Sequence, residues 1–234
     1  MSLNLRLERL YDRIELVNGI GDPDGGKLCL MSLVAFLAGE AHSDAPRTAS
    51  PLIREYAVPI NDGMDRGMRQ RLKPFAPRII GTSDRLDGER AAVLYRAIVH
   101  EVFPEALKDL QQISERAPQV QAGGHLFVLW PQLKTESPAA VDAVLKQAGR
   151  NDTRLIDTIG KMVAAHVKGS HGATGFEAGR LILYAARNAP SGLREAWYWN
   201  KAIDILDRLC DVGAAERPEE AVVCGGAAME SIAG

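Results

Sequence analysis

Residues 27–40 form an almost uninterrupted apolar segment. A helix with no polar face is stable only when other elements cover it on all sides. The segment therefore predicts a central helix of the N-terminal half, ending at Gly39 and Glu40. Its longest apolar run, Leu28 to Ala38, is shorter than the roughly 20 residues that a membrane-spanning helix needs. The pattern favours a core in which other helices pack around this one.

Helical spacing also marks the residues on both sides of that segment. The stripe of Leu3, Leu7, Leu10, Ile14 and Val17 predicts a helix over residues 3–17, followed by a glycine-rich loop. Ser50 before Pro51 is a helix-start pattern. It predicts a helix to about Gly63 that Pro59 bends or shortens. The other helices expected in this half cover residues 65–72, 87–103 and 104–113.

The C-terminal half has the pattern of a helical array. Helix starts are expected at Ser137–Pro138, at Asp152, at the capping box Thr174-x-x-Glu177 and at Ser191. Gly213 is expected to end the last helix. The glycine-rich residues 168–175 are expected to form a flexible loop between two helices. The run Leu126–Trp130 is compatible with a strand or a helical turn, and the turn is favoured because Pro131 follows at once.

These patterns predict an all-α protein with the architecture of an irregular multi-helix bundle. Residues 114–124 are polar and contain a proline, so a boundary there would separate two helical halves. The halves would be an N-terminal helical region, 1–117, and a C-terminal helical array, 118–234. One continuous domain is the alternative. No convincing repeat of about 30–45 residues is present, which disfavours a solenoid.

Charge and cysteine content narrow the classes of function. The formal net charge is −2, so the chain has no overall attraction for nucleic acid or for an anionic membrane surface. The three cysteines, Cys29, Cys210 and Cys224, are widely spaced, which makes a disulfide framework or a zinc knuckle unexpected. The N-terminal residues alternate leucine with charge and form no secretory signal. We therefore expect a cytoplasmic protein without membrane association.

One part of the sequence combines several residue types that functional sites use. Glu40, His42, Ser43 and Asp44 follow the apolar helix, and Asn61 with Asp62 ends the next helix. The short connection between the two helices predicts that they are neighbours, so that Glu40, Asp44 and Asp62 could approach one another.

Two interpretations of this acidic cluster stay open. Grouped carboxylates beside a buried helix could act as an acid or base or hold a hard cation, with His42 as a further acid or base. Alternatively, Asp44 caps a turn and Glu40 pairs with Arg54 or Arg78. The structural interpretation is favoured because the cluster lacks a second histidine at ligand spacing, and no metal or cofactor is expected.

The order of short motifs over about residues 27–100 resembles an uncharacterised family of bacterial and phage proteins. The motifs are Cys29-Leu30-Met31, Ala38-Gly39-Glu40, Ser43-Asp44, Ser50-Pro51, Asn61-Asp62-Gly63, Pro77-Arg78 and Gly81-Thr82. Members often have an aromatic residue where His42 stands and a histidine where Ala45 stands. The resemblance implies no activity and no catalytic residue.

Two further regions contain candidate residues. Trp197-Tyr198-Trp199 lies in a predicted helix, where one tryptophan is expected in the core and the other could mark an interface. His166 and His171 are five residues apart across a predicted helix end, which is not the spacing of two ligands on one helical face. Each is expected to be an ordinary surface or core histidine.

Two functions are compatible with these features. The first is a cytoplasmic helical interaction or regulatory protein that binds a protein partner or forms a homodimer; Ser43, Asn61, Arg78, Trp197 and Trp199 are its candidate binding residues. The second is a hydrolytic or metal-assisted enzyme built on Glu40, Asp44 and Asp62. The first is favoured, and nucleic-acid binding is disfavoured by the charge.

Overall fold

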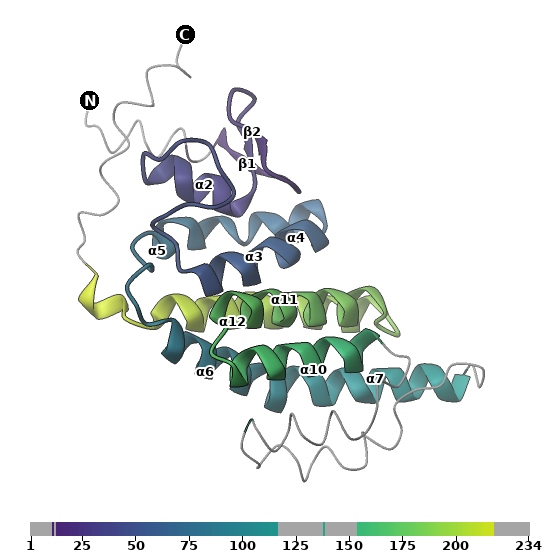
Figure 1. Cartoon of the computed structure of the whole chain (residues 1–234). Helices are drawn as coiled ribbons and strands as arrows, with labels where there is room; N and C mark the ends of the chain where they lie inside the picture. Colours follow the sequence, from purple (N-terminus) through teal and green to yellow (C-terminus); the bar gives the residue numbers. More distant parts are fainter. Residues whose placement is uncertain (1–10, 12, 117–137, 139–153, 218–234) are drawn as a thin grey trace.

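The protein is mostly helical, with one small three-stranded sheet near the N-terminus (Figure 1). The structure is a computed structural model, and it describes residues 11, 13–116, 138 and 154–217. Several predictions fall outside or at the edge of these ranges. They are the boundary at residues 114–124, the run 126–130, the helix starts at Ser137–Pro138 and Asp152, and the chain beyond residue 217. The predominantly helical fold class is confirmed.

The bounds of the elements are as follows. The strands are β1 (Glu15–Leu16), β2 (Gly21–Asp22) and β3 (Lys27–Leu28). The helices of the N-terminal half are α2 (Leu30–Leu37), α3 (Pro51–Gly63), α4 (Arg66–Gln70), α5 (Ala76–Ile79), α6 (Asp87–Ala97) and α7 (Phe103–Arg116). Those of the C-terminal half are α10 (Arg154–Val167), α11 (His171–Arg187) and α12 (Gly192–Asp211). Short 3₁₀ turns cover Lys73–Phe75 and Ala214–Glu216.

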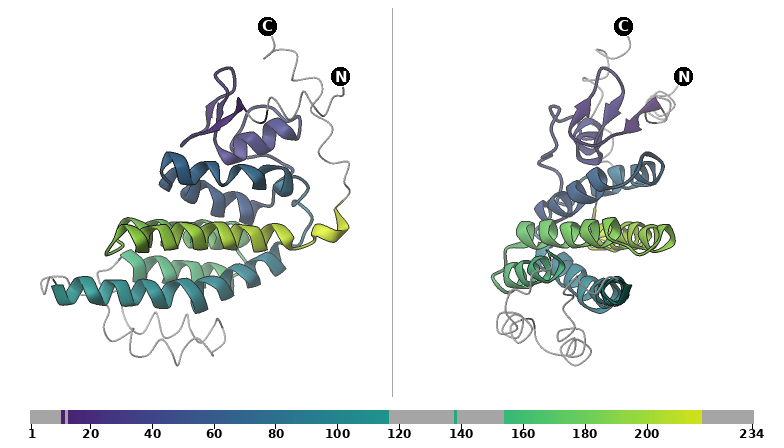
Figure 2. Two further views of the ribbon diagram at one scale, coloured as in Figure 1. Left: turned by 180° about the vertical axis from the view of Figure 1, so that it is seen from behind. Right: turned by 90° about the vertical axis from the view of Figure 1, so that its right-hand side faces the viewer.

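The elements lie in successive layers. The sheet and α2 form one end of the molecule, and α3, α4 and α5 lie beneath them (Figure 1). The next layer contains α11 and α12, and the last contains α6, α7 and α10, as both views in Figure 2 show. Residues from all four layers contribute to one apolar core. The N-terminal and C-terminal halves of the sequence are therefore interleaved.

The prediction of a helix over residues 3–17 is wrong at its C-terminal end, because residues Glu15–Leu16 form a strand. β1 pairs with β3 in parallel, and β3 pairs with β2 in an antiparallel direction. The backbone of Leu16 is held further by Gln70, whose side chain accepts from its N–H at 2.9 Å and donates to its carbonyl at 2.8 Å. These partners lie far along the chain, so periodicity near Leu16 does not reveal them.

The apolar segment forms α2, which is shorter than expected because residues 27–28 are taken by β3. The Cys29 sulfur caps α2 by accepting from the Ser32 N–H at 3.2 Å. Residues Leu30 to Ala35 are all buried, as a helix without a polar face requires.

Two prolines lie inside helical segments without ending them. Helix α3 continues through Pro59 to Gly63. Helices α6 and α7 are joined by a π-helical segment, Ile98–Val102, instead of being broken before Pro104. Because Pro104 has no N–H to donate, a wider turn at this point accommodates it without ending the helix.

The expected loop at 168–175 is confirmed only at residues 168–170, and the expected capping box at Thr174 is wrong, because α11 begins at His171. Thr174 lies in the first turn, where its hydroxyl donates to the Ser170 carbonyl at 2.9 Å. Further along, Gly175 and Gly179 bring α11 against α3. A Cβ atom at Gly179 would lie 2.5 Å from Pro59 Cγ and 2.7 Å from the Tyr56 carbonyl oxygen. Within the described ranges, no helix combines the length and apolar character needed to cross a bilayer.

Candidate functional site

The carboxylate of Glu40 closes the loop between α2 and α3. It accepts hydrogen bonds from the backbone N–H groups of Arg47 at 2.8 Å and Thr48 at 3.0 Å. The expected pairing of Glu40 with Arg54 or Arg78 is wrong, because Arg54 pairs with Glu55 and Arg78 pairs with α12. Both oxygens of Glu40 therefore serve the local backbone, which is the structural role of a capping carboxylate.

The other side chains of this loop face solvent or form a local turn. His42 and Asp44 are exposed. The Ser43 hydroxyl accepts from the Ala45 N–H at 3.0 Å, which is the hydrogen bond of a serine turn.

Asn61 and Asp62 join the end of α3 to the N-terminal segment. Asn61 is 2% exposed; its amide accepts from the Leu30 N–H at 3.2 Å and donates to the Val17 carbonyl at 2.9 Å. The Asp62 carboxylate accepts from the Gly19 N–H at 2.9 Å. Both side chains thus satisfy backbone groups in the connection after β1, and Asn61 also satisfies one at the start of α2.

Asp44 and Asp62 line one small pocket, which Glu40 does not line. The pocket has a volume of about 30 Å³, and its wall includes Cys29 and Asn61. That volume is enough for one or two water molecules but not for an organic substrate. Within the described ranges, no group of three or more histidine, cysteine or acidic residues is placed to hold a metal ion.

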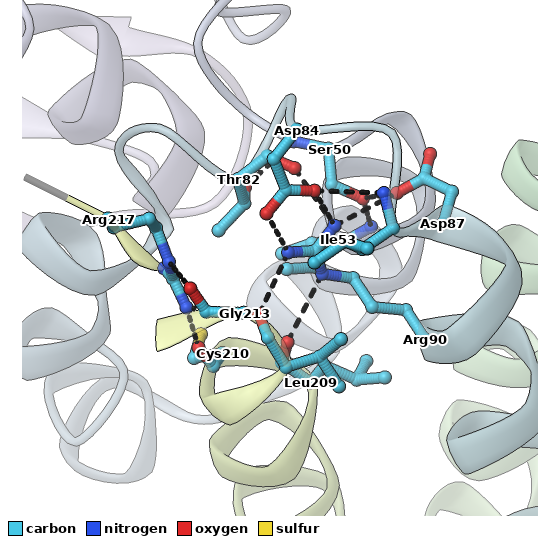
Figure 3. Close-up of polar contacts among 12 residues, drawn as sticks. Ser50, Ile53, Thr82, Asp84, Asp87, Arg90, Leu209, Cys210, Gly213 and Arg217 are labelled. Carbon is cyan, nitrogen blue, oxygen red and sulfur yellow. Dashed lines mark hydrogen bonds and ion pairs between the residues drawn. The ribbon is translucent and has the colours of Figure 1, made fainter. Parts of the chain in front are cut away.

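A buried polar centre that the sequence patterns did not predict surrounds Arg90 (Figure 3). The Arg90 side chain has no exposed surface, and its guanidinium donates two bonds of 2.6 Å to the Asp84 carboxylate. It also donates to three backbone carbonyls, those of Thr82, Leu209 and Val212. Burial lowers the pKa of Arg90, but the bonds to Asp84 and Asp87 outweigh it and leave that pKa above its usual value.

This centre fixes the start of α3 and the end of α12 against α6. Ser50 caps α3 by accepting from the Ile53 N–H, and its hydroxyl donates to Asp87 at 2.5 Å. The Ser50 N–H in turn donates to the Thr82 hydroxyl at 2.8 Å. Arg217 donates to the carbonyls of Cys210 and Val212 beside it (Figure 3). The Arg90 guanidinium is occupied by carboxylates and carbonyls of the chain itself, so the Arg90 centre is a structural element. The sequence feature that could have indicated this centre is the position of Arg90 on the same helical face as the apolar stripe of Ala91, Leu94 and Ile98.

Arg78 and the two tryptophans, which are the remaining candidate binding residues, lie in different environments. Arg78 pairs with Asp207 at 2.5 Å and with Asp211 at 2.7 Å, and so connects α5 to the end of α12. Trp199 is 2% exposed and packs in the core beside Gly63, so it is not available to a partner. Trp197 is only half-buried. One tryptophan thus lies in the core and the other at the surface.

A second polar cluster forms where α6, α10 and α11 meet. The ring of Tyr95 stacks on that of His166, with centroids 4.6 Å apart and planes at 15°. Burial lowers the pKa of His166, and the nearby His171 lowers it further. Burial alone raises the pKa of Tyr95 to about 12. All three side chains have a buried polar atom without a hydrogen-bond partner in the described part of the chain.

Comparisons of this chain with protein-family models, with curated proteins and with solved structures found no match.

Proposed function

We propose that this protein is a cytoplasmic interaction or regulatory protein that binds a protein partner, or a second copy of itself, through the first two turns of α12. The observation that carries the proposal is Leu193, which is 86% exposed and lies one helical turn before the half-buried Trp197. The two residues are four apart, so they share one face of the helix.

This surface is held rigid before any partner arrives. The Arg194 guanidinium lies 4.7 Å from the centre of the Trp197 ring. The same guanidinium pairs with Asp109 at 2.9 Å and with Glu105 at 3.1 Å, both on α7. Because the arginine is fixed by two carboxylates, the tryptophan face loses little conformational freedom when it binds.

The chemistry of the surface suits a protein partner. Tryptophan and arginine are enriched among the residues that dominate binding energy at interfaces. Burying an exposed leucine contributes about 1.5–3 kcal/mol. The neighbouring cations are already neutralised, since Lys201 pairs with Glu101 at 3.0 Å and Arg194 with α7. The net charge of −2 likewise gives no support to a nucleic-acid partner.

An enzyme built on Glu40, Asp44 and Asp62 has less support. The Glu40 carboxylate is occupied by backbone N–H groups, and the pocket shared by Asp44 and Asp62 is too small for a substrate. The interaction function is therefore the one that the described contacts favour.

Sedimentation equilibrium of the purified chain tests self-association. If the partner is a second copy, Leu193→Glu will shift the dimer to monomer while the helical circular dichroism stays unchanged. Ile20→Glu is the matched control, because Ile20 is also exposed, at 43%, but lies between β1 and β2 and not on α12.

A photoreactive amino acid at position 193 tests for a different partner in the native cell. We expect a discrete cross-linked protein with position 193 and none with position 161 on α10, where the Lys161 side chain is also exposed. Equal cross-linking from both positions, together with a monomer in sedimentation, would refute the proposal.

A further inference from the structure

A cavity of about 230 Å³ lies beside the small sheet. Its wall is formed by the chain just before β1, by the turn between β2 and β3 and by Phe36 near the end of α2. The pocket that Asp44 and Asp62 line has a volume of only about 30 Å³. The cavity beside the sheet is therefore large enough for an organic molecule, whereas that pocket is not.

One part of the wall is apolar and continuous with the core. Ile14 and Leu28 are 8% and 2% exposed, and the partly buried Phe36 packs against the same core. An apolar cavity of about 150 Å³ admits one benzene ring, whereas drug-sized ligands occupy about 300–1,000 Å³. The volume therefore suits a small molecule that has one aliphatic or aromatic side chain and a compact polar end.

The other part of the wall contains one cation and one anion, Arg13 and Asp24. Neither side chain has an ion-pair or hydrogen-bond partner among the residues that the structure describes. Their charged neighbours are occupied: the Asp22 carboxylate accepts from the Asp24 N–H at 3.1 Å, and Glu15 pairs with Arg66 at 2.6 Å. A guanidinium binds a carboxylate through two parallel hydrogen bonds, and a carboxylate in turn binds an ammonium group. The wall thus offers a counter-charge to both ends of a zwitterion.

The turn that contributes Asp24 is fixed in place without a ligand. The Gly26 N–H donates to the Pro23 carbonyl at 3.1 Å, and the Gly26 carbonyl accepts from the Glu15 N–H at 2.9 Å. Gly26 has a φ of 64°, in the left-handed region that glycine favours. Because these bonds hold the turn against β1, ligand binding has little backbone freedom to remove there.

We propose that this cavity binds a free α-amino acid with an apolar side chain of the size of leucine or phenylalanine. Arg13 binds the carboxylate of the amino acid, and Asp24 binds its ammonium group. Ile14, Leu28 and Phe36 surround its side chain. None of these residues lies on α12, so this proposal and the proposed partner surface succeed or fail separately.

Calorimetric titration of the purified full chain with L-phenylalanine is the first test, and it needs no variant. We expect one molecule bound per chain. Phenylalaninamide lacks the carboxylate, and N-acetylphenylalanine lacks the ammonium group. Each should bind about tenfold more weakly or worse, because each loses a charged hydrogen-bonding group. Glycine, which has no side chain to bury, should also bind about tenfold more weakly or worse.

Two substitutions assign the two charges. Arg13→Gln and Asp24→Asn should each lower the affinity for phenylalanine about tenfold or more, with unchanged circular dichroism, because both positions are exposed. Arg13→Gln should also bind phenylalanine and its amide almost equally. The matched controls are Arg47→Gln and Glu216→Gln, at exposed positions that do not line the cavity, and both should keep the natural affinity.

Three results would overturn the proposal: no binding of phenylalanine to the natural chain, equal binding of phenylalanine and its amide to that chain, or an equal loss of affinity in the control variants.

Discussion

The guanidinium of Arg90 faces the carboxylate of Asp84 through two hydrogen bonds of 2.6 Å, and the arginine side chain is completely buried. Lysine cannot reproduce this paired geometry, because its ammonium is a single point of charge. The pair also joins α6 to the end of α12, since Arg90 donates to the Leu209 and Val212 carbonyls.

We expect Arg90→Met to lower the free energy of unfolding by about 3–5 kcal/mol. The variant leaves the Asp84 carboxylate and several backbone carbonyls without their hydrogen-bond donor. Arg90→Lys should recover only part of this loss. Urea denaturation followed by circular dichroism measures both values. Arg66→Ala is the control: Arg66 pairs with Glu15 but is 80% exposed, so it should cost about 0–1 kcal/mol. Equal effects at positions 66 and 90 would contradict the structural role of Arg90.

Gly179→Ala should destabilise the protein by about 1–3 kcal/mol or more, because the new methyl group would overlap Pro59 and the Tyr56 carbonyl. Gly160→Ala is the opposite case. Gly160 lies inside α10, where a Cβ atom would meet nothing within 4 Å. There alanine should stabilise the protein by about 0.5–1 kcal/mol through helix propensity. Thermal denaturation of the two variants side by side measures both effects, and equal stabilisation by the two substitutions would contradict the role of Gly179 in the contact of α11 with α3.

Acid should weaken the contact between Glu101 and α12. Hydrogen bonds from Arg208, assisted by Lys201, lower the pKa of Glu101 to about 2. A carboxylate with a lowered folded-state pKa contributes stability above its unfolded pKa of about 4.3, and this contribution is lost as the pH falls toward 2. Urea midpoints between pH 7 and pH 3 should therefore fall less steeply for Glu101→Gln than for the natural chain. Glu216→Gln, at an exposed position, should follow the natural chain.

Glu40→Ala should open the loop between α2 and α3 and cost about 1–2 kcal/mol, because the N–H groups of Arg47 and Thr48 lose their acceptor. Glu40→Gln should cost less, since one amide oxygen can still accept. Hydrogen exchange at Arg47 and Thr48 reports the change directly. Exchange that is unaffected by Glu40→Ala would show that the carboxylate does not hold the loop backbone. Its role would then be a different one, as the enzyme interpretation requires.

Much of the helical frame could be predicted where local chemistry decides. Ser50 with Pro51 starts α3, and Ser191 caps α12 by accepting from the Arg194 N–H. Gly213, with a φ of 72°, follows α12 in the left-handed conformation that glycine favours. Each of these signals operates within a few residues, so a single sequence contains it in full.

Features that depend on distant partners were not predictable. The strand at Leu16 is set by its pairing with Leu28 and by the Gln70 side chain. Likewise, nothing near Tyr95 in the sequence indicates that it will stack on His166, because packing of separate helices brings the two rings together. For the same reason, the sequence does not show that Arg54 pairs with Glu55 and Arg78 with Asp207 instead of with Glu40.

The glycine contact between α11 and α3 makes the two halves of the chain depend on each other for a matching surface. Neither Gly175 nor Gly179 accepts a larger side chain without a shift of α3, since a Cβ atom at Gly179 would overlap Pro59 and one at Gly175 would overlap the Leu52 backbone. Recombination that exchanged only one half for that of a diverged relative would bring together surfaces that no longer fit. We therefore expect the two halves to be inherited as a unit.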